Sequence, residues 1–251
     1  MQRIGIMAAL HEEIAALLER MEDVTTRTIG KRAYHIGQLH GRLCVVVLAR
    51  IGKVAAAATT VTLIREFQVD RIVFSGLAGG LASQVRVGDV VIGTQLLQHD
   101  LDASPLFPRH EVPLLGCSRI FADSDLSAEL EQAARAYFEQ DWETDIPSAT
   151  REAFGLSSPQ VHCGLIVSGD SFVNSAQHVC ELRASLPEAL CVEMEGAAVA
   201  QVCHEYGARF AIVRTVSDRA DEAASNDFNS FLVSVASHYS AGILQRVLDA
   251  L

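Results

Sequence analysis

The sequence predicts a single α/β domain, a three-layer α/β/α arrangement in which helices cover both faces of a twisted, mixed central β-sheet. Short apolar runs typical of strands alternate with helical patterns along all 251 residues. Hydrophobic residues make up 49% of the chain and aromatic residues only 6%, which suits a core of Ala, Val, Leu and Ile. No repeat, low-complexity tract or linker divides the chain, so we expect residues 1–251 to form one domain.

The first half of the chain predicts four strands and two helices. Apolar and β-branched residues cluster in the expected strands, at residues 3–8, 43–48, 71–75 and 85–97. Helical spacing or frequent alanine marks the expected helices, at residues 11–21 and 53–67. Regular alternation of strand and helix fails between residues 71 and 100, so the sheet is expected to contain both parallel and antiparallel strands.

The second half predicts the remaining elements. Strands are expected at residues 163–168, 190–193 and 210–216. Helices are expected at residues 126–140, at 195–206 before Gly207, and from a cap at Asp227 to residue 251. Residues 141–160 contain Pro147, Pro159 and several Ser and Thr residues, which favours a surface loop or insertion.

Charge and cysteine content exclude several classes of partner. The net charge of −11 repels phosphate backbones and anionic lipids, so neither nucleic acid nor a membrane surface is expected to bind. The six cysteines include no CxxC pair and favour buried, reduced thiols over disulfides or zinc ligands. The first residues lack the pattern of a signal peptide, and no run is long enough to span a membrane, so a cytoplasmic protein is expected.

Polar residues at the ends of predicted strands are the first candidates for chemistry, because ligands of open α/β sheets bind beyond the carboxyl ends of strands. Asp218 follows the run FAIVRTVS, and Glu193 and Glu195 lie on either side of Met194. On an extended segment the two glutamates would share one face, with Met194 opposite. Such carboxylates can transfer protons, or they can simply cap helices, and the same two interpretations apply to Glu13 near the first predicted helix.

Other motifs argue against cofactors. The glycine-rich run SGLAGGL lets backbone approach a ligand, but the GxGxxG and GxxxxGK[ST] patterns are absent. RIGK at residues 50–53 has the composition of an anion-binding helix start, although a solvated helix start is the expected outcome. HDLD at residues 99–102 is a weak metal motif, and Ser168 lacks the GxSxG elbow of serine hydrolases. We therefore expect no cofactor and no metal.

Six ordered motifs between residues 4 and 218 resemble a known family. They are IGIMAALHEEI, IGKVAAA, GLAGGL with VGDVVI, GLIVSGDSFVN, VEMEGAAVA and VRTVSD. Together they resemble the 5′-methylthioadenosine/S-adenosylhomocysteine nucleosidases of the nucleoside phosphorylase superfamily. The resemblance implies a nucleoside phosphorylase-like fold, a small-molecule nucleoside substrate, a homodimer and a role in methionine salvage.

The resemblance implies an acid and a base. Glu13 matches the general base that activates water, and Asp218 matches the acid that protonates a purine ring nitrogen, with Ser217 and Arg214 supporting the acid. Chemistry agrees with this assignment, because cleavage of an N-glycosidic bond builds positive charge on the sugar and negative charge on the base. A proton given to the base makes it a neutral leaving group.

The resemblance also implies contacts to the two halves of the nucleoside. Glu195 would accept hydrogen bonds from the ribose hydroxyls, and Met194 would pack on the sugar. Phe172 would stack on adenine, the backbone of Val173 would bind the adenine edge, and Gly79 would line the ligand. The full expected substrate-binding set is Gly79, Phe172, Val173, Glu193, Met194, Glu195, Arg214, Ser217 and Ile51.

The sequence departs from the family at positions that would face the 5′ substituent. Leu77 stands where a serine is common, Leu10 replaces a methionine, and residues 99–113 lack a tyrosine-rich pattern. Residues 106–115 are the part that a partner subunit would contribute to the 5′ pocket. Arg50 stands before Ile51 where a small residue is usual; its guanidinium would suit the carboxylate of homocysteine, but a solvent-facing position at the helix start is favoured.

The leading function is therefore hydrolysis of 5′-methylthioadenosine or S-adenosylhomocysteine to adenine and a thioribose. Hydrolysis is favoured over phosphorolysis because Glu13 would repel phosphate and Leu77 replaces the serine. The alternatives are a phosphorylase, or a nucleosidase acting on another 5′-modified purine nucleoside. A noncatalytic nucleoside-binding protein is a third possibility, against which the retained Glu13, Glu195 and Asp218 argue.

Overall fold

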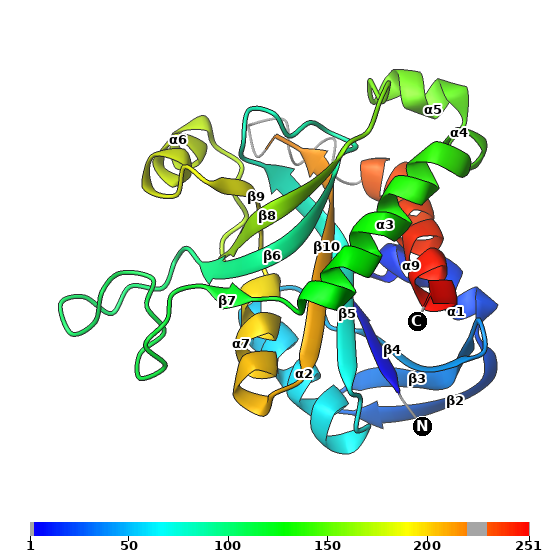
Figure 1. Ribbon diagram of the computed structural model, residues 1–251, viewed down its shortest axis with the longest axis horizontal. Coiled ribbons are helices and arrows are strands. Elements are labelled where there is room, and N and C mark those ends of the chain that lie inside the picture. Colours follow the sequence, from blue (N-terminus) through cyan, green and yellow to red (C-terminus); the bar gives the residue numbers. More distant parts are fainter. Residues whose placement is uncertain (1–2, 220–229, 251) are drawn as a thin grey trace.

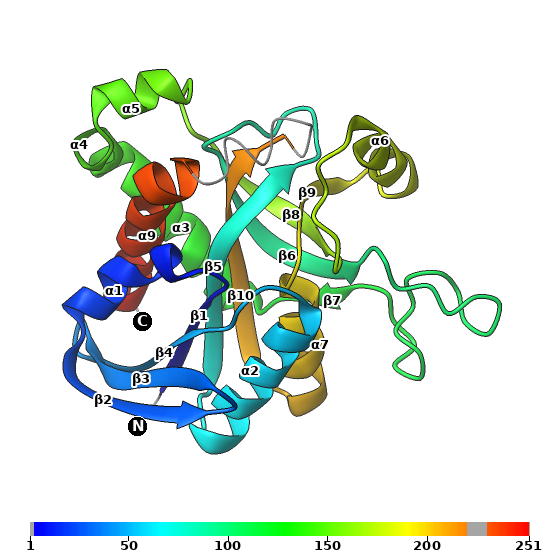
Figure 2. The same cartoon turned by 180° about the vertical axis from the view of Figure 1, so that it is seen from behind.

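The computed structural model describes residues 3–219 and 230–250, apart from the side chain of Glu13. Helices lie on both sides of one mixed sheet, as Figures 1 and 2 show from opposite directions. The predicted three-layer fold is confirmed, and so is the mixture of parallel and antiparallel strands. Asp227, the predicted cap of the last helix, lies outside the described residues.

Ten strands of the described chain form one sheet in the order β10-β6-β8-β9-β5-β1-β4-β3-β2, with β7 beside β6. Their bounds are β1 Ile4–Ala8, β2 Glu22–Ile29, β3 Arg32–Leu39, β4 Arg42–Leu48, β5 Arg71–Gly80, β6 Val90–Gln98, β7 Ile120–Phe121, β8 Val161–Ser168, β9 Ala189–Glu193 and β10 Arg209–Asp218. A further pairing joins β10 to β5, so five of the strands close into a ring. This ring brings together the carboxyl ends of β5, β8, β9 and β10, where Gly79 pairs with both Val192 and Asp218.

The helices form the two outer layers. Their bounds are the 3-10 helix η1 His11–Glu13, α1 Ala15–Arg20, α2 Lys53–Glu66, α3 Ser124–Gln140, α4 Trp142–Asp145, α5 Ser148–Ala153, α6 Ala176–Ser185, α7 Gly196–Tyr206, the π-helix η2 Leu232–Ala236 and α9 Ser237–Ala250. Alternate residues of a strand face opposite layers. On β1, Ile4 and Ile6 pack towards α1, α3 and α9, whereas Met7 packs towards α2 and α7. All three side chains are buried, so the central strands read as continuous apolar runs.

Strands β2, β3 and β7 and helix α6 were not predicted from the sequence. The strands β2 and β3 form a hairpin around Gly30 and Lys31, which both have positive φ angles, as a tight two-residue turn requires. Strand β2 lies at the edge of the sheet and is almost entirely exposed, so it carries no apolar pattern. Helix α6 packs on β8 and β9 over a third, smaller apolar cluster.

The prediction that residues 141–160 form a surface loop is wrong. The segment contains α4 and α5, and it inserts Trp142, Ile146 and Leu156 into the core. The indole nitrogen of Trp142 donates to the hydroxyl of Tyr239 on α9 at 2.8 Å. Pro147 and Ser148 begin α5 and do not mark a solvent-exposed loop, because Trp142, Ile146 and Leu156 supply the burial of the segment.

The cysteine prediction is right in part. All six thiols are free, and Cys44, Cys191 and Cys203 are buried. Cys163 and Cys180 are exposed, so burial was wrongly predicted for these two. Within residues 3–219 and 230–250, no helix combines the length and the apolar character that crossing a bilayer requires.

Candidate active site

A cavity opens at the carboxyl ends of β5, β9 and β10, and it encloses about 770 Å³ of empty space including its open mouth. Backbone of the glycine-rich end of β5 forms its floor, which suits the close approach expected of SGLAGGL. Its lining residues come from six separate segments of the chain. They are Ala9, Leu10, Ile51, Gly76, Leu77, Ala78, Gly79, Ser171, Phe172, Val173, Val192, Glu193, Met194, Glu195, Arg214, Ser217 and Asp218.

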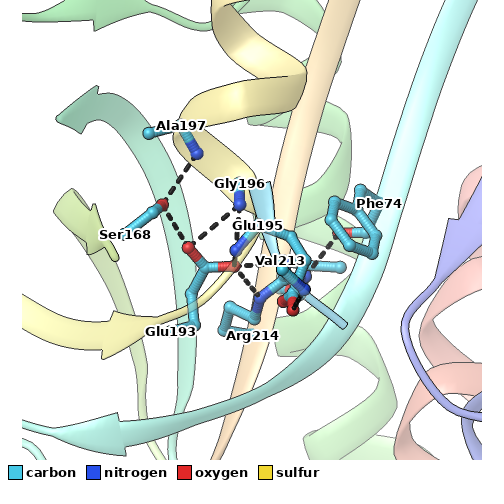
Figure 3. Close-up of polar contacts among 9 residues, drawn as sticks. Phe74, Ser168, Glu193, Glu195, Gly196, Ala197, Val213 and Arg214 are labelled. Carbon is cyan, nitrogen blue, oxygen red and sulfur yellow. Dashed lines mark hydrogen bonds and ion pairs between the residues drawn. The ribbon is translucent and has the colours of Figure 1, made fainter. Parts of the chain in front are cut away.

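A buried ion pair underlies the cavity (Figure 3). Arg214 donates to the Glu193 carboxylate through Nε at 3.2 Å and Nη2 at 2.7 Å, and the side chains are only 1% and 2% exposed. The guanidinium also lies 4.1 Å from the ring centre of Phe74 and donates to its carbonyl oxygen. Charges this deeply buried need a full set of partners, and here the two ions pair with each other and with backbone groups around them.

The Glu193 carboxylate also holds the start of α7. It accepts hydrogen bonds from the backbone N–H groups of Glu195 and Gly196, at 3.1 Å and 2.8 Å, and from the hydroxyl of Ser168. The Ser168 hydroxyl oxygen in turn accepts from the N–H of Ala197 at 2.7 Å. The first N–H groups of α7 therefore point at a carboxylate and a hydroxyl, as helix starts require. This arrangement sets the direction in which Glu195 leaves the sheet.

The Glu195 side chain reaches across the cavity to the start of α2. Its Oε1 accepts a hydrogen bond from the backbone N–H of Gly52 at 2.8 Å, and the residue is 5% exposed. Gly52 has φ +98°, a conformation that other residues rarely adopt. The anion-binding potential predicted for residues 50–53 is thus satisfied by carboxylates of the protein itself, and the expected solvated helix start is wrong.

Asp218 ends strand β10 at a point where its pairing with β5 is irregular. The residue is 5% exposed, and its Oδ2 accepts a hydrogen bond from the Ser217 hydroxyl at 2.7 Å. A strand irregularity of this kind redirects a side chain away from regular alternation. Both Ser217 and Asp218 consequently line the cavity, although they are neighbours in the chain.

The apolar side of the cavity is formed by two loops. Phe172 and Val173 lie on the loop between β8 and α6, where Val173 is buried and Phe172 is 45% exposed at the mouth. Ile51 is likewise exposed and lies on the loop before α2. Large apolar side chains that are exposed beside a cavity offer surfaces on which a flat ligand can pack.

Arg50 and the segment between β6 and β7 are not among the residues that line the cavity. Arg50 is exposed, and its Nη2 donates to the carbonyl oxygen of Lys31 at 2.6 Å, on the hairpin turn. This agrees with the favoured solvent-facing position. The chain between β6 and β7 makes loops that extend away from the body of the molecule (Figure 1), although His99 at its start is buried and Asp100 bonds to Lys53. Leu106 and Leu114 on this segment are 83% and 91% exposed.

Comparisons with known proteins agree with the motifs. The phosphorylase superfamily matches residues 3–249. The aminodeoxyfutalosine nucleosidase of Helicobacter pylori (strain J99) is 35% identical over 252 residues, which is 100% of both chains. The 5′-methylthioadenosine/S-adenosylhomocysteine nucleosidase of Actinobacillus succinogenes is 34% identical over 232 residues, 92% of this chain and 91% of that one. The crystal structure of the Neisseria meningitidis nucleosidase with methylthio-immucillin-A has a TM-score of 0.87 and 37% identity, covering 100% of both chains.

The chain belongs to the 5′-methylthioadenosine/S-adenosylhomocysteine nucleosidase family. The resemblance read from the six motifs is therefore confirmed, together with the nucleoside phosphorylase-like fold. The structure places every predicted substrate-binding residue of this nucleosidase family member, and the predicted acid Asp218, on one cavity. Glu13 ends η1, three residues after the cavity-lining Leu10; its side chain lies outside the described residues.

Two details of the predicted site need correction or addition. Met194 lines the cavity with both neighbouring glutamates, so the predicted alternation is wrong; β9 ends at Glu193, and the chain bends before α7. Arg214, predicted to support the acid, donates to Glu193, and its support of Asp218 stays a prediction.

Sequence reasoning also missed contributors to the nucleosidase site. Ser168 was considered only as a nucleophile, yet it caps α7, and Gly52 was not singled out although it holds Glu195. Ser168 ends a predicted strand, but nothing near it in the sequence indicates that it bonds to a helix that starts 28 residues later. In the described part of the chain, no three His, Cys, Asp or Glu side chains gather as a metal-binding group.

Proposed function

We propose that the protein hydrolyses the N-glycosidic bond of 5′-methylthioadenosine or S-adenosylhomocysteine, releasing adenine and the 5′-thioribose. Its class as an N-glycosyl hydrolase that releases adenine follows from its family. The single observation that carries the mechanism is the placement of two buried carboxyl groups, Asp218 and Glu195, on one cavity with the exposed ring of Phe172.

Asp218 acts as the general acid in this proposal. Its carboxyl group is buried at the end of β10 and lines the cavity, where it is placed to give a proton to a bound base. The Ser217 hydroxyl donates to Oδ2 of Asp218 and orients the carboxyl group, which gives its proton to a purine ring nitrogen. Protonation there lets the base leave as neutral adenine, while Phe172 stacks on it and the backbone of Val173 binds its edge.

Glu195 and Glu13 act on the sugar. Glu195 is held beside the cavity by the Gly52 N–H and accepts hydrogen bonds from the ribose hydroxyls, while Met194 packs on the ring. The negative charge of Glu195 favours the oxocarbenium-like transition state. Glu13, which follows the cavity-lining Leu10 on η1, deprotonates the attacking water.

Water is proposed as the nucleophile in place of phosphate. Leu77 is buried, lines the cavity and offers no hydrogen-bond donor to an anion. A phosphate bound near a basic carboxylate such as Glu13 would also be repelled. These residues support hydrolysis, and no cofactor is needed for either proton transfer.

A second candidate substrate is aminodeoxyfutalosine. The Helicobacter pylori relative that is 35% identical over its whole length is an aminodeoxyfutalosine nucleosidase. Both substrates present adenine and ribose to the same contacts and differ at the 5′ position. Residues 106–115, which include the exposed Leu106 and Leu114 and which a partner subunit would contribute to the 5′ pocket, are the part of the chain expected to discriminate between them.

One assay tests the proposal. The purified protein is incubated with 5′-methylthioadenosine, S-adenosylhomocysteine, aminodeoxyfutalosine and adenosine, each with and without phosphate, and the released base and sugar are identified. We expect adenine and a free 5′-modified ribose, at a rate independent of phosphate. A sugar 1-phosphate, or turnover that requires phosphate, would contradict the proposal. Glu13→Gln, expected to lower turnover at least about a hundredfold, serves as the inactive control.

We further propose that the protein is a homodimer. The loops between β6 and β7 project from the body (Figure 2) and carry the exposed Leu106 and Leu114, an arrangement typical of a segment that packs on another subunit. Light scattering coupled to size-exclusion chromatography should give twice the mass of one chain. Leu114→Asp should shift the protein towards monomer, whereas a wild-type protein that is monomeric at micromolar concentration would contradict the proposal.

A further inference from the structure

Two backbone N–H groups at the start of α2 bind carboxylates from different parts of the site. The Gly52 N–H donates to Oε1 of Glu195 at 2.8 Å, and the Lys53 N–H donates to Oδ1 of Asp170 at 2.8 Å. N–H groups in the first turn lack partners within the helix and carry the positive end of its dipole. One helix start therefore holds both the carboxylate assigned to the ribose and the loop assigned to adenine.

Asp100 bonds to both Lys53 and Asp170, so these three residues contact one another; we call them the triangle. The Lys53 ammonium donates to Oδ1 of Asp100 at 2.6 Å and to the side-chain oxygen of Gln98 at 3.1 Å. The Asp170 N–H donates to Oδ2 of Asp100 at 2.9 Å. Partial burial raises the pKa of Asp100, but the hydrogen bonds from Lys53 and from the Asp170 N–H outweigh it and leave the pKa below its ordinary value. Both Asp100 oxygens thus accept bonds as an ionised carboxylate.

The loop that this triangle holds is short and fixed at both ends. It begins at Gly169, whose N–H donates to the carbonyl oxygen of Glu193 at 3.1 Å. A Cβ atom on Gly169 would lie 2.3 Å from Nε2 of the buried His99, so the loop passes close to the end of β6. It ends at Ser175, which caps α6. Between these ends, Asp170 has the only side chain for which the described residues show a hydrogen bond to α2.

We infer that Lys53, Asp100 and Asp170 are positioning residues that set the distance between the adenine loop, residues 169–175, and the ribose carboxylate of Glu195. The inference rests on the function proposed above, because it takes the roles of Phe172 and Glu195 from there. These three residues act on the ligand only through the loop and α2. Loss of the triangle weakens adenine binding equally in the ground state and the transition state, so KM rises while kcat is kept.

Four variants test the inference. Asp100→Asn leaves one acceptor for two donors, and Asp170→Ala removes the side-chain link to α2. Asp170→Asn keeps an oxygen that accepts from the Lys53 N–H, so it is the conservative rescue. Glu131→Gln is the matched control, because it breaks an exposed ion pair to Arg135 on the surface of α3. For each we would measure kcat, KM, the adenine Kd by calorimetry and the midpoint of thermal unfolding.

Asp100→Asn and Asp170→Ala should raise both KM and the adenine Kd about tenfold, the size expected from losing a hydrogen bond to a charged group. Their kcat should stay within about threefold, and Asp170→Asn and the control should resemble the parent. Unchanged KM and adenine Kd in folded variants, even with a lower unfolding midpoint, would overturn the inference. If Asp100→Asn does not fold, the two Asp170 variants test the inference alone, because Asp170 is exposed. A parent protein that binds adenine but cleaves no nucleoside refutes the proposed function, and the adenine Kd still tests the triangle.

Discussion

Replacing Glu193 with glutamine tests the buried ion pair beneath the cavity. The substitution keeps the shape of the side chain but removes its charge and turns one acceptor oxygen into an NH2 donor. In the parent protein, that carboxylate faces donors on every side: two nitrogens of Arg214, the N–H groups of Glu195 and Gly196, and the Ser168 hydroxyl. The new NH2 group must face one of these donors, and Arg214 keeps its charge without a carboxylate.

The cost follows from the burial of the pair. Arg214 is 1% exposed, so its cation cannot turn to water when Glu193 loses its charge. Removing one partner of a buried pair costs about 3–5 kcal/mol, which is a large part of the roughly 5–15 kcal/mol that stabilises a typical domain. Turnover should fall as well, because Glu193 holds the N–H groups from which α7 and Glu195 start.

Equilibrium unfolding in urea measures the effect as a shift of the midpoint at constant slope. Glu131→Gln, which breaks the exposed pair with Arg135 on α3, is the matched control and should cost at most about 0.5 kcal/mol. The double variant Glu193→Gln/Arg214→Met removes both charges and should recover part of the loss. A loss below about 1 kcal/mol for Glu193→Gln, with the fold intact, would refute this reasoning.

Three other substitutions give separate tests. Asp218→Asn should lower kcat for adenine release at least about a hundredfold in a folded protein, and near-normal turnover would remove it from the mechanism. Hydrogen bonds from Arg209 lower the pKa of Asp123, the cap of α3, in the folded protein. They therefore stabilise the folded state above the pKa that Asp123 has in the unfolded chain, and this stabilisation is lost as the pH falls through the lower, folded-state pKa. Urea unfolding of Asp123→Asn should therefore show a free-energy deficit of about 1 kcal/mol or less at pH 7 that disappears as the pH falls below the ordinary range of an aspartate carboxyl, and a deficit that does not change with pH would contradict this. Gly88→Ala should lower the free energy of unfolding by about 1–3 kcal/mol more than Gly155→Ala does. Both glycines have positive φ, but only at Gly88 would an added Cβ meet another side chain, that of Leu156. Equal losses in the two variants would contradict this.

Local patterns were enough to predict most of the central fold. The strands β1, β4 and β10 are largely buried on both faces and read as apolar runs whose ends lie within two residues of those predicted, whereas β5 runs five residues further than predicted, to Gly80. Hairpin strand β2 was missed because an exposed edge strand is not selected for apolar residues, and its only local signal was the turn at Gly30. Residues 141–160 were misjudged because their three core side chains are too sparsely spaced to show a period.

The sequence by itself determined which polar groups end the strands, and so it named Asp218, Glu193 and Glu195 as candidates. Only the tertiary structure decided what each of them does. It paired Glu193 with Arg214 beneath the cavity, and it turned Glu195 towards an N–H group that lies 143 residues earlier in the chain. Local propensity depends on near neighbours, whereas the partner of a buried charge is chosen by the closure of the sheet. That closure joins β10 to both β5 and β6, a pairing that no short stretch of sequence encodes.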